Sequence, residues 1–449
     1  MELAENIQDS KARSPWTPLK NVSKVIVSPN KNLIEGSITV PGSKSLTNRA
    51  LILAALANGK SEISGILKSD DSYWCIDALR KLGVAIEVEE DRVLVNGKGG
   101  SWDSAKLYIG AAGTVARFLP DALAVSGKGV WEVEASHSMS KRPIAPLMDA
   151  LKELGADVQY ASNEGHYPLV IQGKELVGGE VSMSGNTSSQ FISGLLMAGP
   201  SFKAPLTVTI EDHIVQHAYV FLTLELMEKF GANTHYDSSL SKIVIEPGQY
   251  TPQNIDLEAD ASTACYFLAL AAVTNGKIRI DNLTSDTRQP DIKMLEVFER
   301  MGCRVIRGDS FIELAGTEQL RGGFELSMRE MSDQTLTLAS IAAFADGPIT
   351  IREVKHIRHH ESDRISAICQ SLSKLGIKVE EFEDGLTVYP STPVPATLDT
   401  YDDHRVAMSL ALIGSRVAGI ELNDPGCVSK TCPQYFEMLE SLNLNIQRS

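Results

Sequence analysis

Long hydrophobic runs, aromatic residues and organised cysteines are all scarce in this sequence. Aromatic residues make up 6% of the 449 positions, and no apolar stretch reaches the length that a membrane-spanning helix needs. The N-terminal region carries Glu2, Glu5 and Asp9 and lacks the apolar core of a secretory signal. These absences argue against a membrane or exported protein, and we expect a cytoplasmic one.

The six cysteines do not form a pattern that binds metal. Cys427 and Cys432 lie close together in the sequence, but no second pair completes a zinc set. His356, His359 and His360 are close neighbours without a carboxylate or cysteine partner at ligand spacing. We therefore expect reduced thiols and no metal site.

The charge balance limits the partners of the protein. The 57 acidic residues outnumber the 42 basic ones and give a net charge of −15, which disfavours nucleic acid or an anionic membrane surface. A chain of this length usually exceeds what one hydrophobic core serves, and its 43% hydrophobic content is sufficient for two cores. Two domains are expected.

A helix-start signal recurs through the whole chain. It combines a small or capping residue with the first turn of an apolar helix, and it is found near positions 43, 113, 187, 260, 332 and 403, so that successive steps are 70, 74, 73, 72 and 71 residues. A second signal, a helix end followed by Gly and a strand, runs in parallel at 82–84, 154–158, 230–232, 301–305 and 375–379, with a degenerate copy at 442–446. The sequence predicts six repeats of an αβ unit of about 70 residues, three in each domain.

The first of these helix starts has the composition of an anion site. In the segment Pro41-Gly-Ser-Lys-Ser-Leu-Thr-Asn-Arg49, Ser43 is placed to cap a helix that we expect to stop at Asn58-Gly59. The free N–H groups and positive dipole end of such a helix attract anions, and Lys44 adds a full charge.

Other cations of this acidic chain lie near the later helix starts. For any single one of them, the alternative interpretation is a basic residue on a solvated surface. The candidates are Lys44, Arg49, Arg117, Arg142, Arg364, Arg405 and Lys430. Together they favour one cleft that binds substrates with several negative charges. Asp333, Glu361 and Asp403, which lie among these cations in the sequence, are candidates for general acid and base catalysis.

Eight short motifs in order resemble the 5-enolpyruvylshikimate-3-phosphate synthase family. They are Pro-Gly-Ser-Lys-Ser…Asn-Arg at 41–49, Gly-Thr…Arg at 113–117, Arg-Pro-Ile at 142–144, Ser-Ser-Gln-Phe at 188–191, Asp-Ala-Ser at 260–262, Glu-Ser-Asp-Arg at 361–364, Asp-Asp-His-Arg at 402–405 and Ser-Lys-Thr at 429–431. The resemblance runs from about residue 32 to the C-terminus. It implies transfer of the enolpyruvyl group of phosphoenolpyruvate to the 5-hydroxyl of shikimate 3-phosphate, through a tetrahedral ketal, with release of phosphate.

The resemblance also implies an architecture. The family fold is α/β, with two inverse α/β-barrel-like domains of three βαβαββ-type units each. By analogy one domain would span residues 43–257, and the other would join residues 1–42 to 258–449. No metal or organic cofactor is implied, the partners would be the two small-molecule substrates, and a monomer is expected.

The family's functional positions can be carried over to this sequence. The implied proton-transfer residues are Asp333, Glu361 and Lys44, with Asp333 serving the hydroxyl and either Glu361 or Lys44 serving the methylene carbon. The implied phosphoenolpyruvate site comprises Lys44, Gly113, Arg142, Gln190, Arg364, Asp403, His404, Arg405 and Lys430. The implied shikimate 3-phosphate site comprises Ser45, Arg49, Ser188, Ser189, Tyr219 and Asp333.

The chain departs from the usual pattern at several of these motifs. His360 replaces a lysine of many relatives, and His356 and Gln216 also differ. If His360 takes the role of the lysine, affinity for shikimate 3-phosphate should weaken as the pH rises from ~6 to ~8. Phe118 replaces a proline, which predicts a narrowed phosphoenolpyruvate pocket and an altered sensitivity to glyphosate.

Three other functions compete with this interpretation. UDP-N-acetylglucosamine enolpyruvyl transferases share the repeat fold but usually carry a reactive loop cysteine, whereas Cys75 lies in a helical context without basic neighbours. A non-catalytic phosphometabolite-binding relative would keep the cleft without the chemistry. An RNA-end-processing enzyme conflicts with the acidic charge.

Overall fold

The chain divides into two compact units. The computed structural model describes residues 10–30 and 32–449. Unit 1 contains Pro15–Pro41 and Ala259–Ser449, and unit 2 contains Gly42–Glu258 together with residues 10–14. The described chain therefore passes between the units after Ser14, Pro41 and Glu258, and residues 10–14 group with unit 2 rather than with the rest of the N-terminal segment.

Each unit consists of three repeats of one βαβαββ pattern. The second repeat shows it without interruption, in the order β6 (Ala105–Tyr108), α3 (Val115–Ala124), β7 (Val130–Glu134), α5 (Ala145–Glu153), β8 (Asp157–Tyr160) and β9 (Leu169–Gln172). The first two strands pair in parallel and the last two form an antiparallel hairpin, which gives the sheet order β6-β7-β9-β8. The short helix α4 (His137–Ser140) lies between β7 and α5.

The other repeats of unit 2 follow the same order. The third contains β10 (Gly179–Met183), α6 (Ser189–Ala198), β11 (Leu206–Ile210), α7 (Ala218–Lys229), β12 (Thr234–Tyr236) and β13 (Lys242–Ile245). The first contains α1 (Lys44–Leu56), β3 (Asn58–Ser64), α2 (Asp70–Lys81), β4 (Ala85–Val88) and β5 (Arg92–Lys98), and its missing first strand is supplied by β14 (Asn254–Asp256). This pairing of β14 with β3 closes the unit on itself.

Unit 1 repeats the pattern with strands from both ends of the chain. Its elements are β1 (Lys24–Ser28), β2 (Glu35–Ile38), α8 (Ala261–Thr274), β15 (Lys277–Ile280), η3 (Pro290–Lys293), α9 (Met294–Arg300), β16 (Arg304–Arg307), β17 (Ile312–Ala315), β18 (Phe324–Ser327), η4 (Arg329–Gln334), α10 (Thr335–Ala342), β19 (Ile349–Arg352), η5 (Lys355–His359), α11 (Arg364–Lys374), β20 (Val379–Phe382), β21 (Gly385–Val388), β22 (Thr397–Leu398), α12 (His404–Ile413), β23 (Ile420–Asn423), η6 (Pro425–Lys430), α13 (Tyr435–Ser441) and β24 (Asn445–Arg448). β2 pairs in parallel with β15, and β1 lies between β23 and β24.

The α/β class and the sixfold repeat are confirmed. Six four-stranded sheets are present in the described residues, three per unit, and none of them closes into a barrel. The turn that follows the second helix of each repeat needs a left-handed residue, which glycine adopts without strain. The residues with positive φ at these turns are Gly83 (85°), Gly155 (89°), Gly231 (91°), Gly302 (96°), Gly376 (75°) and, in the degenerate copy, Asn443 (69°).

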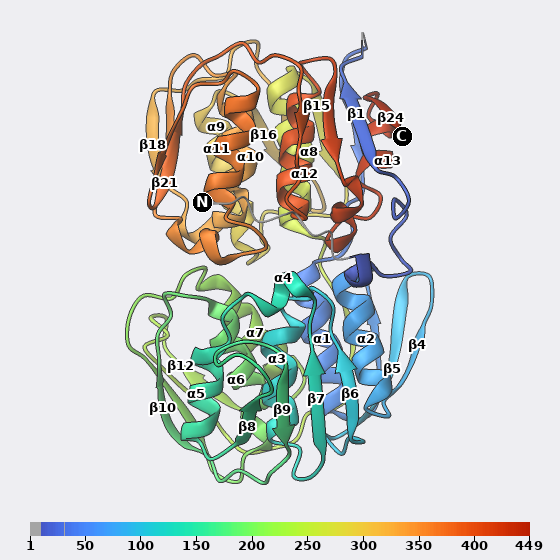
Figure 1. The fold of residues 1–449 in the computed structure, drawn as a ribbon, viewed down its shortest axis with the longest axis vertical. Helices are drawn as coiled ribbons and strands as arrows, with labels where there is room; N and C mark the ends of the chain where they lie inside the picture. Colours follow the sequence, from blue (N-terminus) through green and yellow to red (C-terminus); the bar gives the residue numbers. More distant parts are fainter. Residues whose placement is uncertain (1–9, 31) are drawn as a thin grey trace. The chain divides into compact units, whose positions relative to one another are not determined.

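Three buried helices occupy the middle of each unit. In unit 1 these are α8, α10 and α12, which contact one another (Figure 1) and bury almost every side chain. A helix that is apolar on all sides is stable only inside a core. In unit 2, α6 approaches α3 closely at Gly194, where a Cβ atom would lie 2.0 Å from the carbonyl oxygen of Arg117.

The first helix stops just before Asn58-Gly59, as the sequence predicts. It ends at Leu56, and Asn58 and Gly59 already belong to β3, because they pair with Lys98 and Gly97 of β5 rather than forming a turn.

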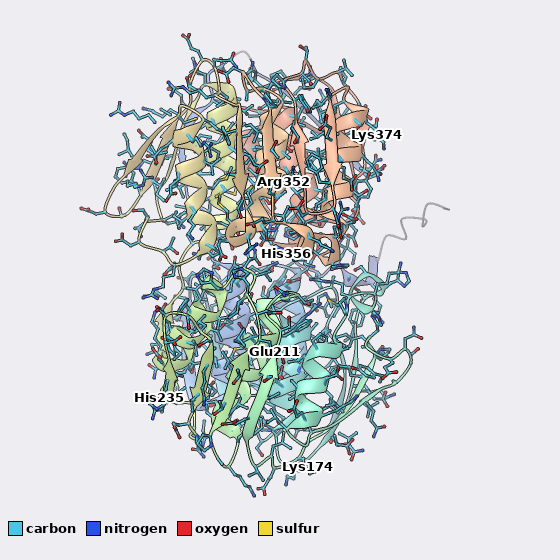
Figure 2. The ribbon with its side chains drawn as sticks, turned by 90° about the vertical axis from the view of Figure 1, so that its left-hand side faces the viewer. Lys174, Glu211, His235, Arg352, His356 and Lys374 are labelled. Atoms are coloured by element: carbon cyan, nitrogen blue, oxygen red, sulfur yellow. The ribbon has the colours of Figure 1, made fainter. Side chains whose placement is uncertain are left out.

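The exposed faces of the sheets are charged: Arg352 on β19 (Figure 2) pairs with Glu325 and Asp384. No helix in the described part of the chain is long and apolar enough to cross a membrane.

Candidate active-site clusters at the helix N-termini

Most of the predicted site residues lie at or beside helix starts in both units, whereas Lys430 ends η6 and Arg142 lies between α4 and α5. In unit 1 they are Asp333, His360, Glu361, Arg364, Asp403, His404, Arg405 and Lys430, and in unit 2 they are Lys44, Ser45, Arg49, Gly113, Arg142, Ser188, Ser189, Gln190 and Tyr219. We call these sets the unit 1 cluster and the unit 2 cluster.

Arg364 is the centre of the unit 1 cluster. It is 1% exposed, and its guanidinium donates to Asp403 Oδ2 at 2.8 Å, to Asp333 Oδ1 at 2.9 Å and to Glu361 Oε2 at 2.7 Å. These residues meet because Arg364 opens α11, Asp333 directly precedes the last residue of η4, and Asp403 caps α12. Burial opposes the charge of Arg364, but the carboxylates of Asp403, Glu361 and Asp333 outweigh it and raise the pKa of Arg364.

Two further cations complete this cluster. Arg405 donates to Asp333 Oδ2 at 2.9 Å and to the hydroxyl of Tyr266 at 3.3 Å, and the Lys430 ammonium lies 3.3 Å from Glu361 Oε1. Asp333 and Glu361 are therefore each held between two cations. Two cations fix the orientation of such a carboxylate, and at least one cation can remain in contact with it when the carboxylate gains or loses a proton.

His360 lies against this ion-pair network in a neutral state. Its side chain is 19% exposed, and its Nδ1 lies 3.0 Å from Arg364 Nη1. Burial and the charge of Arg364 hold the pKa of His360 well below its usual value, which favours the neutral imidazole. A guanidinium at hydrogen-bond distance opposes protonation of His360, which argues against the expectation that His360 replaces a lysine as a titrating cation.

The three other histidines of this region, His356, His359 and His404, differ in their surroundings. His356 (Figure 2) shares a hydrogen bond of 2.7 Å with the hydroxyl of Ser332, next to Asp333. His404 is fully buried at the start of α12, with Nδ1 3.7 Å from Asp403 Oδ1. His359 is exposed. In the described residues, no group of three or more His, Cys, Asp or Glu is arranged to hold a metal ion.

Lys44 leads the unit 2 cluster. It is the first residue of α1, it is 15% exposed, and its ammonium lies 3.8 Å from Asp71 Oδ2 at the start of α2. This arrangement places a cation and a free helix N-terminus together, as the sequence predicts. The N-cap residue Ser43 makes no side-chain capping bond.

Arg49 is buried beneath this helix start. It is 1% exposed, and its guanidinium donates to Thr223 Oγ1 at 2.7 Å, to the carbonyl of Ser45 at 3.0 Å and to Ser193 Oγ at 3.3 Å. Burial lowers the pKa of Arg49 to about 10, which leaves it charged at neutral pH. Arg49 thus fixes the backbone at Ser45 through the hydrogen bond to its carbonyl.

Phe118 packs into the same interior. Its ring is fully buried, and the guanidinium carbon of Arg49 lies 4.8 Å from its centroid. Phe118 is therefore part of the packing around Arg49, and the expected effect on glyphosate sensitivity stays a prediction.

Gly113 gives two guanidiniums room to approach the backbone. A Cβ atom at this position would lie 3.0 Å from Arg142 Nη1 and 3.5 Å from Arg117 Nη1. Arg117 Nη1 also donates to the Gly113 carbonyl at 3.1 Å. The backbone just before α3 therefore faces concentrated positive charge.

The remaining predicted residues of unit 2 lie at the starts of α6 and α7. Ser188 caps α6 by accepting from the Gln190 N–H at 3.2 Å, and Oε1 of Gln190 is buried without a hydrogen-bond partner in the described chain. Tyr219 is in the first turn of α7, and Gln216 precedes it with a strained φ of 51°.

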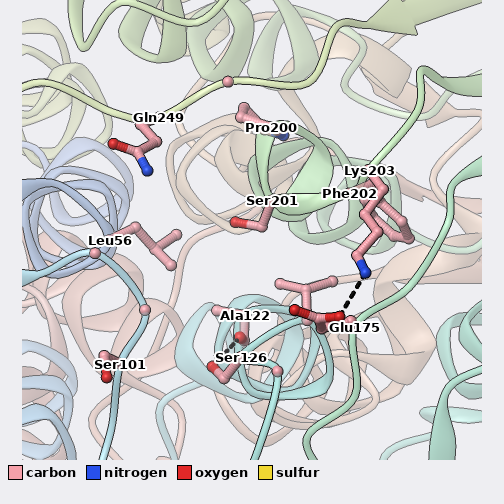
Figure 3. Close-up of a pocket in the computed structure, with 15 residues that line it drawn as sticks. Leu56, Ser101, Ala122, Ser126, Glu175, Pro200, Ser201, Phe202, Lys203 and Gln249 are labelled. Carbon is pink, nitrogen blue, oxygen red and sulfur yellow. Dashed lines mark hydrogen bonds and ion pairs between the residues drawn. The ribbon is translucent and has the colours of Figure 1, made fainter.

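A pocket of about 390 Å³ lies elsewhere in unit 2. It is formed where α1, α3 and α6 end, and its lining includes Leu56, Ala122 and Ser201 together with the ion pair of Lys203 and Glu175 (Figure 3). Helix C-termini carry partial negative charge and disfavour anions. This pocket is therefore distinct from the predicted anion site at the opposite helix ends.

Sequence reasoning missed several residues of these clusters. Asp71, Tyr266 and Asp291 contribute buried polar atoms, yet none of them belongs to a motif that the sequence analysis used. A signal existed only for Asp71, since consecutive acidic residues at a helix start are typical of an N-terminus.

Comparisons with known proteins support one family. The model of the EPSP synthase family (3-phosphoshikimate 1-carboxyvinyltransferase) matches residues 29–439. The chain is 63% identical over 440 residues to 3-phosphoshikimate 1-carboxyvinyltransferase 2 of Halalkalibacterium halodurans, with 98% of each chain covered. It is 38% identical over 456 residues to the chloroplastic 3-phosphoshikimate 1-carboxyvinyltransferase of Brassica napus, with 97% of this chain and 88% of the relative covered.

Solved structures agree with this result. The EPSP synthase of Acinetobacter baumannii matches with a TM-score of 0.81 at 26% identity, over 95% of this chain and all of that one (100%). The enolpyruvyl transferase NikO of Streptomyces tendae shares the fold, with a TM-score of 0.78 at 20% identity over 95% of this chain and 99% of that one. The matches of the family model and of the close relatives extend over nearly the whole sequence, and this chain belongs to the EPSP synthase family.

Proposed function

We propose that this protein transfers the enolpyruvyl group of phosphoenolpyruvate to the 5-hydroxyl of shikimate 3-phosphate and releases phosphate. The observation that carries the proposal is the unit 1 cluster, in which Arg364 holds Asp333, Glu361 and Asp403 within 2.9 Å in a buried setting. The reaction requires cations for the phosphate and carboxylate groups, and it also requires carboxylates that can exchange protons.

The chemistry proceeds by addition and then elimination. In the addition, Asp333 takes the proton of the 5-hydroxyl, whose oxygen bonds to C2 of phosphoenolpyruvate, while an acid gives a proton to the methylene carbon. In the elimination, a methyl proton is removed and the bond from C2 to the phosphate oxygen breaks. Glu361 is a suitable partner for the carbon, because Lys430 at 3.3 Å stabilises its carboxylate after it gives up the proton. Lys44 is the alternative.

The proposed recognition residues for each substrate come from both clusters. We assign phosphoenolpyruvate to Lys44, Gly113, Arg142, Gln190, Arg364, Asp403, His404, Arg405 and Lys430, and shikimate 3-phosphate to Ser45, Ser188, Ser189, Tyr219 and Asp333, with Arg49 supporting Ser45 and His360 remaining neutral beside Arg364. Units 1 and 2 are the proposed domains. The protein is proposed to act as a cytoplasmic monomer.

The cell-wall alternative has little support in this chain. A UDP-N-acetylglucosamine enolpyruvyl transferase of the usual type needs a reactive cysteine in its first domain. Cys75 is the one cysteine of unit 2 in the described residues, and it is buried. Burial, and after it the charge of Asp71, raises the pKa of the Cys75 thiol far above its usual range, so that it is a poor nucleophile.

The direct test is phosphate release from phosphoenolpyruvate with shikimate 3-phosphate in one assay and UDP-N-acetylglucosamine in the other. Release with shikimate 3-phosphate alone is expected, and Asp333→Asn should lower kcat by about 10²- to 10⁴-fold, the usual contribution of a general base. The control Asp309→Asn removes an exposed carboxylate and should leave kcat unchanged. Release with the sugar nucleotide alone would overturn the assignment, and binding without release would indicate a relative that lacks the chemistry.

A further inference from the structure

A buried carboxylate outside the predicted site lies behind Asp333. Asp291 is in η3, it is 0% exposed, and its Oδ2 accepts hydrogen bonds from the Ser262 hydroxyl and from Gln334 Nε2, the latter at 3.2 Å. Its Oδ1 is buried without a hydrogen-bond partner in the described chain. Burying a carboxylate with one oxygen unpaired lowers the free energy of unfolding, so the presence of Asp291 at this position calls for a functional explanation.

The hydrogen bonds of Asp291 lead to the chain segment that carries Asp333. Gln334, the next residue, is fully buried, and its Nε2 donates to Asp291 and, at 3.3 Å, to the Ser262 carbonyl. Its Oε1 accepts from Thr337 Oγ1 at 3.0 Å. Gln334 is thus fixed at both ends of its amide, and the junction between η4 and α10 cannot rotate without breaking these bonds.

Asp291 also acts on Asp333 through its charge. Burial, followed by the charge of Asp333, raises the pKa of Asp291 to about 6, while Arg405, Ser262 and Gln334 oppose this shift. Repulsion between two carboxylates is mutual, so an ionised Asp291 raises the proton affinity of Asp333 by the same free energy.

Helix α8, which packs against η3, carries further titratable groups, among them Cys265 and, as its N-cap, Asp260. On α8, Cys265 donates its thiol to the Asp291 carbonyl at 3.4 Å, and burial keeps the pKa of Cys265 well above its usual value. Asp260 begins the same helix and accepts from the Thr263 N–H at 2.7 Å. The charged groups that shift the pKa of Asp291 are therefore Asp333 and Arg405.

We propose that Asp291 is a positioning residue for Asp333: it anchors the junction through Gln334, and its negative charge makes Asp333 a stronger proton acceptor. The inference deepens the proposed function and rests on it, because it takes Asp333 as the base. Asp333 lies between the guanidiniums of Arg364 and Arg405, which weaken it as a base, and Asp291 offsets part of their effect.

The test is the pH dependence of kcat for phosphate release, with both substrates saturating. In the wild type, kcat should rise with pH through the ionisation of Asp291 near 6. In Asp291→Asn this rise should disappear, and kcat at pH 8 should fall by about three- to tenfold, since one pKa unit is a tenfold change in proton affinity. Both KM values should stay within about twofold, because Asp291 is not assigned a contact with substrate.

A stability measurement separates the effect of the Asp291 charge on Asp333 from a purely structural role of Asp291. Replacing a buried ionised carboxylate by an amide of the same shape should leave the Tm at pH 8 equal or higher, whereas a structural role predicts a lower Tm. The matched control is Asp286→Asn, which removes an exposed carboxylate from the loop just before η3 and should change neither kcat nor the pH profile.

A second variant keeps the test decisive if Asp291→Asn folds poorly. Ser262→Ala removes a donor to Asp291 Oδ2, so the pKa of Asp291 should rise and the rise of kcat should move to higher pH. A pH profile that is the same in the wild type, Asp291→Asn and Ser262→Ala would overturn the inference while leaving the proposed function intact. A wild type without turnover would overturn the proposed function itself, and the base role of Asp333 with it.

Discussion

At the scale of single residues, the guanidinium of Arg364 determines how charge is arranged in unit 1. Its five N–H donors form a rigid planar fork, which allows one side chain to hold carboxylates from three helix starts. Lysine could not do this, because its compact ammonium cannot orient planar carboxylates in the same way. The cluster therefore depends on arginine at this position.

Arg364→Gln should destabilise the protein by about 3–5 kcal/mol and abolish turnover. The variant leaves Asp333, Glu361 and Asp403 in a buried site without their shared cation. Urea unfolding at pH 7.5 and the phosphate-release assay measure the two effects. The control Arg307→Gln removes a bidentate but exposed ion pair with Glu299, and it should cost about 1 kcal/mol or less.

His360 gives a second prediction at this scale. Because Arg364 and burial keep its imidazole neutral, KM for shikimate 3-phosphate should be flat from pH 6 to 8, and His360→Gln should leave that profile unchanged. A KM that rises several-fold over this range in the wild type and is flat in the variant would contradict the neutral state.

The same shift has a consequence for stability. Folding lowers the pKa of His360 below 6.5, the value that the residue has in the unfolded chain. Just below pH 6.5, therefore, the unfolded chain binds a proton at this imidazole and the folded protein does not. The wild type should therefore lose stability as the pH falls below 6.5, and His360→Gln should lose less.

At the scale of helices and strands, packing is decided by contacts that sequence patterns do not record. Gly194→Ala illustrates this, because alanine favours a helix by about 1 kcal/mol yet the new Cβ atom would lie 2.0 Å from the Arg117 carbonyl on α3. We expect a net loss of about 2 kcal/mol or more in the free energy of unfolding. Gly248→Ala is the control, since no atom lies within 4 Å of its added methyl group and the change should stay within about 0.5 kcal/mol. An unchanged urea midpoint in Gly194→Ala would show that α3 and α6 can separate.

The repeat was predictable because its signals are local. A left-handed residue after each second helix follows from backbone geometry. Of the residues before the central helices, Asp260, Ser188 and Asp403 accept capping bonds, whereas Ser43, Thr114 and Gln334 do not. The strands that complete the first and last repeats were not predictable in the same way. β14 and β1 pair with partners far away in sequence, and such pairing depends on tertiary position.

The clustering of the candidate residues near helix ends was predictable, but their electrostatics were not. Motifs indicated Arg49 and His360, but only the packed structure shows that Arg49 is enclosed by Thr223, Ser193 and Phe118 and that Arg364 touches His360. Asp291 carries no motif at all. Its importance follows from neighbours on α8 and η4, which come together only when the repeats pack.

At the scale of the whole molecule, the N-terminal segment is attached to both units. Residues 10–14 group with unit 2, where Ser14 N donates to Asp70 Oδ1 at 2.8 Å and Trp74 Nε1 donates to the Ala12 carbonyl at 2.8 Å. Residues from Pro15 onward group with unit 1, where the hydroxyl of Thr17 donates to Ser429 Oγ at 3.3 Å, next to Lys430. The segment therefore touches the start of α2 in one unit and the end of η6 in the other.

A chain that begins at Pro15 should lose stability in unit 2. The truncation removes two hydrogen bonds and the contact of the Lys11 ammonium with the Tyr108 ring at 4.2 Å, partly offset by the conformational entropy regained, so we expect a loss of about 1–2 kcal/mol. Urea unfolding followed by tryptophan emission measures it, and the emission of Trp74 should shift to the red as its indole becomes hydrated. Lys11→Ala separates the contributions, because it deletes the ring contact alone and should cost about 0.5 kcal/mol. If the truncated chain unfolds at the wild-type urea concentration with unchanged emission, the contacts of residues 10–14 do not stabilise unit 2, since losing one buried and one partly buried hydrogen bond from a folded unit has a measurable cost.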